Sequence, residues 1–65
     1  MPYKTNNDLP DTLKHHLPEH AQSIFRKAFN SAYEQYDNEA TAFKVAWAAV
    51  KKEYEKGADG QWVKK

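Results

Sequence analysis

Hydrophobic residues recur at helical spacing in three segments of the chain. In the first segment Leu9, Leu13 and Leu17 stand four residues apart, which gives a short helix one apolar stripe. Pro18 ends this segment, because a proline disfavours helical geometry in the residue before it. The pattern predicts a first helix at about 9–16.

The second segment carries a wider apolar face. Pro18 also suits a helix start, where its missing N–H group is not needed. Apolar residues then recur at spacings of three and four: Ala21, Ile24, Phe25, Ala28, Phe29, Ala32, Tyr33 and Tyr36. We predict a second helix at about 18–36. The polar stretch Asp37-Asn38-Glu39 is a short connection, so the next helix turns back on the second.

The third segment, 39–56, is apolar around most of its circumference. On a helical wheel its large residues form a bulky stripe, which consists of Phe43, Trp47, Val50 and Tyr54. Small residues form a neighbouring alanine stripe, which consists of Ala42, Val45, Ala46 and Ala49. We expect the bulky stripe to lie in the core and Gly57 to end the helix. The alanine stripe has two interpretations: the same chain covers it, or it binds a partner or a second copy.

The two ends of the chain carry extended-type residues. We expect the segments 2–5 and 60–64 to pair as a small sheet supported by the helices, because an isolated pair of strands is marginal in water. The predicted fold is therefore mainly α. It is a compact bundle of three helices, at about 9–16, 18–36 and 39–56, with a two-stranded sheet formed by the chain ends, in one domain spanning 1–65.

Composition limits the kinds of protein that the chain can be. At 65 residues it buries only about 60% of the surface that its unfolded form exposes. The absence of cysteine excludes disulfides and thiolate metal sites. The first residues lack the apolar stretch of a secretory signal, and the longest apolar run, 45–50, is far shorter than the ~20 residues that span a bilayer. We expect a soluble, cytoplasmic protein without membrane insertion.

The polar residues offer little catalytic chemistry. His16 and His20 are four residues apart, the spacing of some metal ligands, but Pro18 separates them onto different helices. Ser23 and Ser31 lie on a predicted helix surface, without the strand-to-helix turn that exposes a nucleophilic serine. We therefore expect a protein that is not an enzyme and has no metal or cofactor.

Charge suggests one alternative function. The net charge is only +1, but six of the ten basic residues lie in 44–65, against three of the nine acidic ones. Lys44, Lys51 and Lys52 share a polar strip of the third helix, with Lys56 and Trp62 nearby. Aromatic rings among cations can stack on nucleic-acid bases. Against this alternative, the chain's pI of about 8.0 is below the value of about 9 that is typical of dedicated binders.

An ordered set of short motifs resembles the ChaB family of bacterial proteins. The motifs are Met1-Pro2-Tyr3, Asp8-Leu9-Pro10, Leu17-Pro18, His20-Ala21-Gln22, Ala28-Phe29-Asn30, Val45-Ala46-Trp47-Ala48-Ala49-Val50-Lys51, Tyr54 and Trp62. The resemblance implies a small domain of three helices and a sheet. It also implies regulation of a sodium (calcium)/proton antiporter, with no catalytic or ligand residues to carry over. Other members have a longer charged segment where this chain has Asp37-Asn38-Glu39.

The sequence thus predicts a small, non-enzymatic regulatory or interaction protein. Its expected partner is another protein, with a cation/proton antiporter as the candidate. Nucleic-acid binding through the lysine strip and Trp62 is the alternative, and a homodimer is also open. The candidate partner-binding residues are Ala42, Ala46, Ala49, Lys44, Lys51, Lys52, Lys56 and Trp62.

Overall fold

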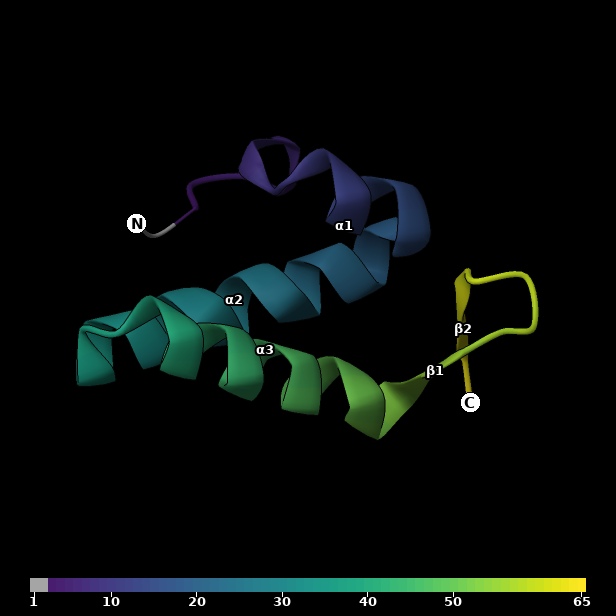
Figure 1. Cartoon of the computed structure of the whole chain (residues 1–65). Helices are drawn as coiled ribbons and strands as arrows, with labels where there is room; N and C mark the ends of the chain where they lie inside the picture. Colours follow the sequence, from purple (N-terminus) through teal and green to yellow (C-terminus); the bar gives the residue numbers. More distant parts are fainter. Residues whose placement is uncertain (1–2) are drawn as a thin grey trace.

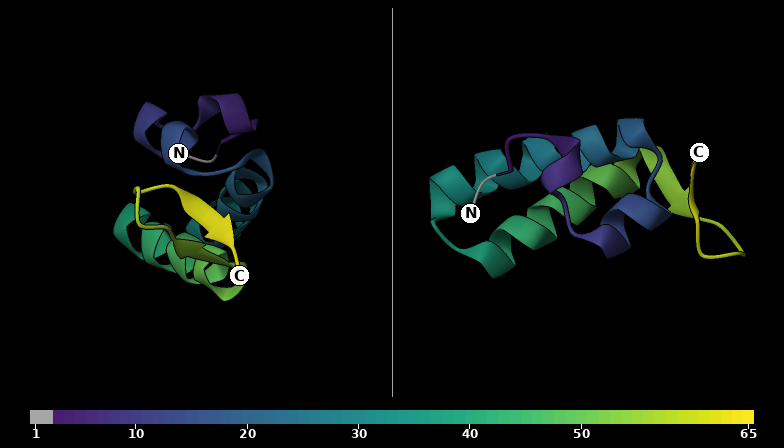
Figure 2. Two further views of the ribbon diagram at one scale, coloured as in Figure 1. Left: turned by 90° about the vertical axis from the view of Figure 1, so that its right-hand side faces the viewer. Right: turned by 90° about the horizontal axis from the view of Figure 1, so that it is seen from above.

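A computed structural model describes residues 3–65 of the chain as a helical fold with a C-terminal β-hairpin (Figure 1). The elements are a 3-10 helix η1 (Asn6–Asp8), helices α1 (Asp11–His16), α2 (Glu19–Tyr36) and α3 (Glu39–Glu53), and strands β1 (Tyr54–Lys56) and β2 (Trp62–Lys64). Helices α2 and α3 run antiparallel, side by side. The N-terminal segment with η1 and α1 crosses over them (Figure 2). The predicted mainly α fold, with three helices and a two-stranded sheet, is confirmed.

Prolines set the starts of the first two helices. Leu9 has extended backbone angles (φ −66°, ψ 152°), because the ring of Pro10 disfavours helical geometry in the residue before it. Helix α1 therefore begins at Asp11, two residues later than predicted. Pro18 precedes α2 as its N-cap, one residue from the predicted start.

The turn between α2 and α3 is fixed by two polar residues. Asp37 has the left-handed conformation (φ 50°, ψ 40°), and its N–H group donates to the carbonyl oxygen of Tyr33 at 2.7 Å. The side chain of Asn38 then accepts a hydrogen bond from the N–H group of Thr41 at 2.9 Å. The chain therefore reverses within two residues, and α3 begins at its predicted position.

The sheet is confirmed, but both of its strands come from the C-terminal part of the chain. Strand β1 pairs antiparallel with β2 in the register Tyr54 to Lys64, Glu55 to Val63 and Lys56 to Trp62. Helix α3 therefore ends at Glu53 and does not reach residue 56 as predicted. The prediction that Gly57 ends the helix is also wrong, since this glycine belongs to the hairpin turn.

The N-terminal segment, the predicted partner of 60–64, binds α2 instead. The side-chain amide of Asn30 takes the place of a neighbouring strand: it accepts from the N–H group of Tyr3 and donates to its carbonyl oxygen, both at 2.7 Å. The ring of Tyr3 packs 4.9 Å from the ring of Phe29. Burial raises the pKa of the Tyr3 hydroxyl, and the carboxylate of Glu39 raises it further. Pro2 lies outside the described residues.

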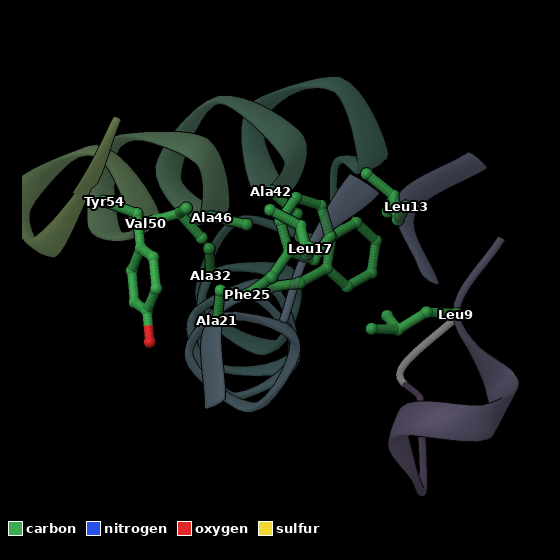
Figure 3. Packing of buried hydrophobic residues seen from close by; sticks show 11 residues of the cluster. Leu9, Leu13, Leu17, Ala21, Phe25, Ala32, Ala42, Ala46, Val50 and Tyr54 are labelled. Atoms are coloured by element: carbon green, nitrogen blue, oxygen red, sulfur yellow. The ribbon is translucent and has the colours of Figure 1, made fainter. Parts of the chain in front are cut away.

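The core lies between α2 and α3 and is closed by the leucines of the N-terminal segment (Figure 3). Helix α3 turns Ala42, Ala46 and Val50 toward α2, and all three are fully buried. Small side chains at this contact let the two helices approach closely. Phe43 and Trp47 lie beside this line and are only partly buried. The expected burial of the bulky stripe is thus correct for Val50 and Tyr54, and partial for the two larger residues.

Candidate functional site

A groove of about 480 Å³ lies where α1, α3 and the hairpin meet; we call it the tryptophan groove. Helix α1 contributes Thr12, Leu13 and His16, helix α3 contributes Trp47 and Lys51, and the hairpin contributes Lys56, Gly60 and Trp62. Its volume is within the range of about 300–1,000 Å³ that is usual for ligand sites.

Two pairs of neighbouring residues supply half of the residues that line the groove. Trp47 and Lys51 are four residues apart on α3, so they lie on one face of the helix. Lys56 and Trp62 are directly opposite one another in the sheet, where side chains of paired residues point to the same side. The two indole rings meet with centroids 5.2 Å apart and planes inclined by 31°. Each tryptophan therefore has a lysine beside it, and the rings join α3 to the hairpin.

Glycines shape the turn that carries Trp62 to this position. The N–H group of Gly57 donates to the carbonyl oxygen of Gln61 at 2.6 Å, and a Cβ atom on Gly57 would lie 2.9 Å from that same oxygen. Gly60 has a φ of 88°, which side chains other than glycine rarely tolerate. The tight turn needs both glycines, and it fixes the register that places Trp62 opposite Lys56.

Helix α1 forms the opposite wall of the groove. Leu13 is in the core, so the helix is held against the bundle, while Thr12 and His16 are exposed at the rim. The side-chain amide of Gln22 donates to the carbonyl oxygens of Leu17 at 2.8 Å and Lys14 at 3.3 Å, which ties the end of α1 to α2. Helix α1 is therefore held in place by the burial of Leu13 and by the hydrogen bonds from Gln22 of α2.

The charge of the groove is positive. None of its described lining residues is acidic. Within residues 3–65 the one ion pair joins Lys14 to Asp11, so the ammonium groups of Lys51 and Lys56 have no carboxylate partner there. Glu55 lies next to Lys56 in sequence, but alternation along β1 turns its side chain to the other face of the sheet. The groove thus combines an apolar floor with two unpaired cations.

Comparison with known proteins shows the family. The family model ChaB matches residues 9–65. The chain belongs to the ChaB family. It is 56% identical to the proteins named "Putative cation transport regulator ChaB" of Escherichia coli (strain K12) and Shigella flexneri, across 100% of this chain and 99% of each relative. The structure is similar to an NMR solution structure with the same name, with a TM-score of 0.89 and 55% identity over 98% of this chain and 99% of the other.

This member of the ChaB family is shorter than the two named relatives. The alignment with each relative spans 75 positions and this chain has 65 residues, so ten positions have no counterpart here. The resemblance at the level of sequence implied a longer charged segment between the second and third helices. In this chain two residues, Asp37 and Asn38, make that connection.

The structure separates the candidate residues named from the sequence into three groups. It brings Lys51, Lys56 and Trp62 together in the tryptophan groove. Lys44 and Lys52 are exposed on α3 but do not line it. Ala42 and Ala46 are fully buried against α2, and Ala49 is partly buried. The chain itself therefore covers much of the alanine stripe, which leaves Val45, 38% exposed, as its most accessible large residue.

Sequence reasoning missed the groove's other residues. Trp47 was placed in the core with the bulky stripe, yet it is partly exposed. His16 was considered as a metal ligand and as an ordinary surface residue, yet it lies at the rim of the groove. Trp47 and Lys51 are one helical turn apart, and this spacing could have predicted from the sequence that α3 contributes both residues to one site.

The described residues contain no grouped metal ligands and no membrane-spanning helix. Across residues 3–65 no three His, Cys, Asp or Glu side chains are grouped so that they could hold a metal ion. The ring of His20 packs 6.3 Å from the ring of Tyr54, and His16 lines the groove. In the same part of the chain, no helix is long and apolar enough to cross a membrane.

Proposed function

We propose that this protein is a non-enzymatic regulator of cation transport that acts by binding another protein, and that the partner is a sodium (calcium)/proton antiporter. Two lines of support meet here. Full-length relatives carry the name of a cation transport regulator. The groove presents partly exposed tryptophans beside unpaired lysines, which is the observation that carries the proposal.

Such a groove is suited to binding. Tryptophan is enriched among the residues that dominate the energy of protein interfaces, because a large ring is removed from water on contact. Lysine can lay its alkyl chain along an apolar surface while its charge stays in water. Trp47 and Trp62 with their neighbouring lysines therefore offer both contact area and charge to a partner.

Reconstituted transport tests the proposal. An antiporter in lipid vesicles, with its cytoplasmic side outward, is assayed for sodium/proton exchange with increasing amounts of the purified chain. We expect the exchange rate to change and to reach a plateau, since a bound regulator acts only until its site is filled. An unrelated small protein of the same net charge is the control. An exchange rate that stays constant while circular dichroism shows folded chain would contradict the proposal.

Nucleic-acid binding remains a second proposal, favoured by the meeting of Trp62, Lys51 and Lys56 in one groove. With two lysines at phosphates, the logarithm of the affinity for single-stranded DNA should fall with the logarithm of salt concentration with a slope of about −1.4. Fluorescence anisotropy with a short oligothymidylate measures this slope. Binding that is absent at low salt, or that does not change with salt, would remove this function.

A further inference from the structure

We propose that the tryptophan groove binds a short acidic peptide segment of the partner. In this arrangement an apolar side chain of the peptide packs against Trp47 and Trp62, and carboxylates on either side of it pair with Lys51 and Lys56. The inference rests on the proposed function only in that the partner is a protein. It adds where the partner binds and what chemistry the bound segment has.

The distribution of burial within the groove supports an apolar anchor. Leu13 is buried, and the indole rings of Trp47 and Trp62 are partly buried, so the floor is apolar. Lys51 and Lys56 are exposed at the edge. Interfaces commonly have an apolar centre with a polar rim, in which the centre supplies most of the binding energy. An apolar residue flanked by acidic residues is the complement of this arrangement.

The two lysines give the groove a positive charge that complements an acidic ligand. Lys51 approaches from α3 and Lys56 from β1, so the two cations are on different elements around one hollow. No described carboxylate pairs with either of them or lines the groove. Because the whole chain has a net charge of only +1, an attraction for acidic ligands is a local property of this surface.

The same geometry favours a peptide over a nucleic-acid strand. A strand is followed by a row of cations, with its bases stacked on free aromatic faces. Here the rings of Trp47 and Trp62 pack on one another with centroids 5.2 Å apart, and Trp47 also packs against Phe25, so these contact surfaces are not free for bases. Two further exposed lysines of α3, Lys44 and Lys52, lie outside the groove. Two localised cations around an apolar floor therefore suit two carboxylates of a peptide better than they suit the continuous phosphate backbone of a nucleic-acid strand.

The experiment is a titration of the full chain into a fluorescein-labelled peptide of Asp and Glu residues around a central Leu. A matched peptide has Asn and Gln in place of the acids. We expect saturable binding of the acidic peptide only. The double variant Lys51→Gln/Lys56→Gln should bind it about tenfold more weakly, since each exposed ion pair contributes a few-fold in affinity.

The matched control is the double variant Lys44→Gln/Lys52→Gln, which removes the same charge from exposed positions of α3 outside the groove. It should bind within about twofold of the unchanged chain. Equal weakening in both double variants would show a diffuse charge effect and overturn the inference. So would the absence of saturable binding, equal binding of the uncharged peptide, or displacement of the peptide by oligothymidylate at lower concentration.

These outcomes also separate the inference from the function on which it rests. If peptide binding depends on Lys51 and Lys56 but transport does not change, the proposed peptide site is supported and the proposed role in transport is contradicted. A transport effect that reaches half its maximum at the same concentration in the Lys51→Gln/Lys56→Gln variant would keep the regulatory function and overturn the groove as its docking site.

Discussion

Replacing Ala46 with glutamate is expected to unfold the protein. Ala46 is 0% exposed on the face of α3 that packs against α2. A longer side chain there overfills the contact, which costs about 1–3 kcal/mol, and burying its charge without a partner costs several kcal/mol more. A domain of this size has a total stability of roughly 3–10 kcal/mol, at about 0.05–0.15 kcal/mol per residue. Circular dichroism during urea unfolding would show the loss of helix.

The matched control is Ala48→Glu, two positions further along the same helix. Ala48 is exposed, so the same substitution should change the free energy of unfolding by only about 0.5 kcal/mol. An Ala46→Glu variant with the urea midpoint of the unchanged chain would mean that α2 does not cover this residue. The hypothesis that the alanine stripe binds a partner or a second copy would then be favoured.

Phe25→Ala should destabilise the protein by about 3–5 kcal/mol, the cost of removing a large side chain from a packed core. Phe25 is fully buried on α2. Its ring contacts the rings of Phe43 and Trp47, with centroids 5.9 and 5.1 Å away, and is stacked with Phe29. The variant therefore loses contacts with both sides of the helix pair. Chemical denaturation followed by tryptophan fluorescence measures the change.

Tyr36→Ala provides the comparison for this second substitution. Tyr36 is also an aromatic residue of α2, but it is 55% exposed, so its removal should cost about 0.5 kcal/mol or less. A loss for Phe25→Ala as small as the one expected for Tyr36→Ala would show that Phe25 is not in the core. A loss for Phe25→Ala below about 1 kcal/mol would contradict the packing described for α2 and α3 in the same way.

The helices could be predicted because the starts of α2 and α3 depend on residues close by in sequence. Pro18 marks the boundary between α1 and α2, and Asn38 caps α3 with its own side chain. Helical spacing identified the apolar faces of all three helices. These signals act within a few residues, and they gave a mainly α fold that agrees with the structure.

The sheet and the orientation of α3 depend on contacts between distant residues, which the pattern does not contain. Residues 54–56 continue a helical sequence without a break, but pairing with Trp62–Lys64 draws them into a strand. Likewise, a helical wheel shows two apolar stripes but cannot say which one meets α2. In the structure Ala42 and Ala46 are the alanines of α3 that are fully buried.

The candidate site was predictable in part for the same reason. Lys51, Lys56 and Trp62 were identified from charge and aromatic content, and the structure brings them together. Their grouping with Trp47 requires the hairpin register, which places Trp62 opposite Lys56 and against α3. Lys44 and Lys52 have the same composition signal, but they lie outside the groove.

The central claim is that binding takes place in the tryptophan groove and not on the exposed side of α3. The most direct measurement is the change in backbone amide and indole N–H chemical shifts when the acidic peptide is added to the full chain. We predict that the largest shifts occur at the indole N–H groups of Trp47 and Trp62 and at the amide of Gly60. Largest shifts around Lys44 and Val45, with both indole signals unmoved, would contradict the claim.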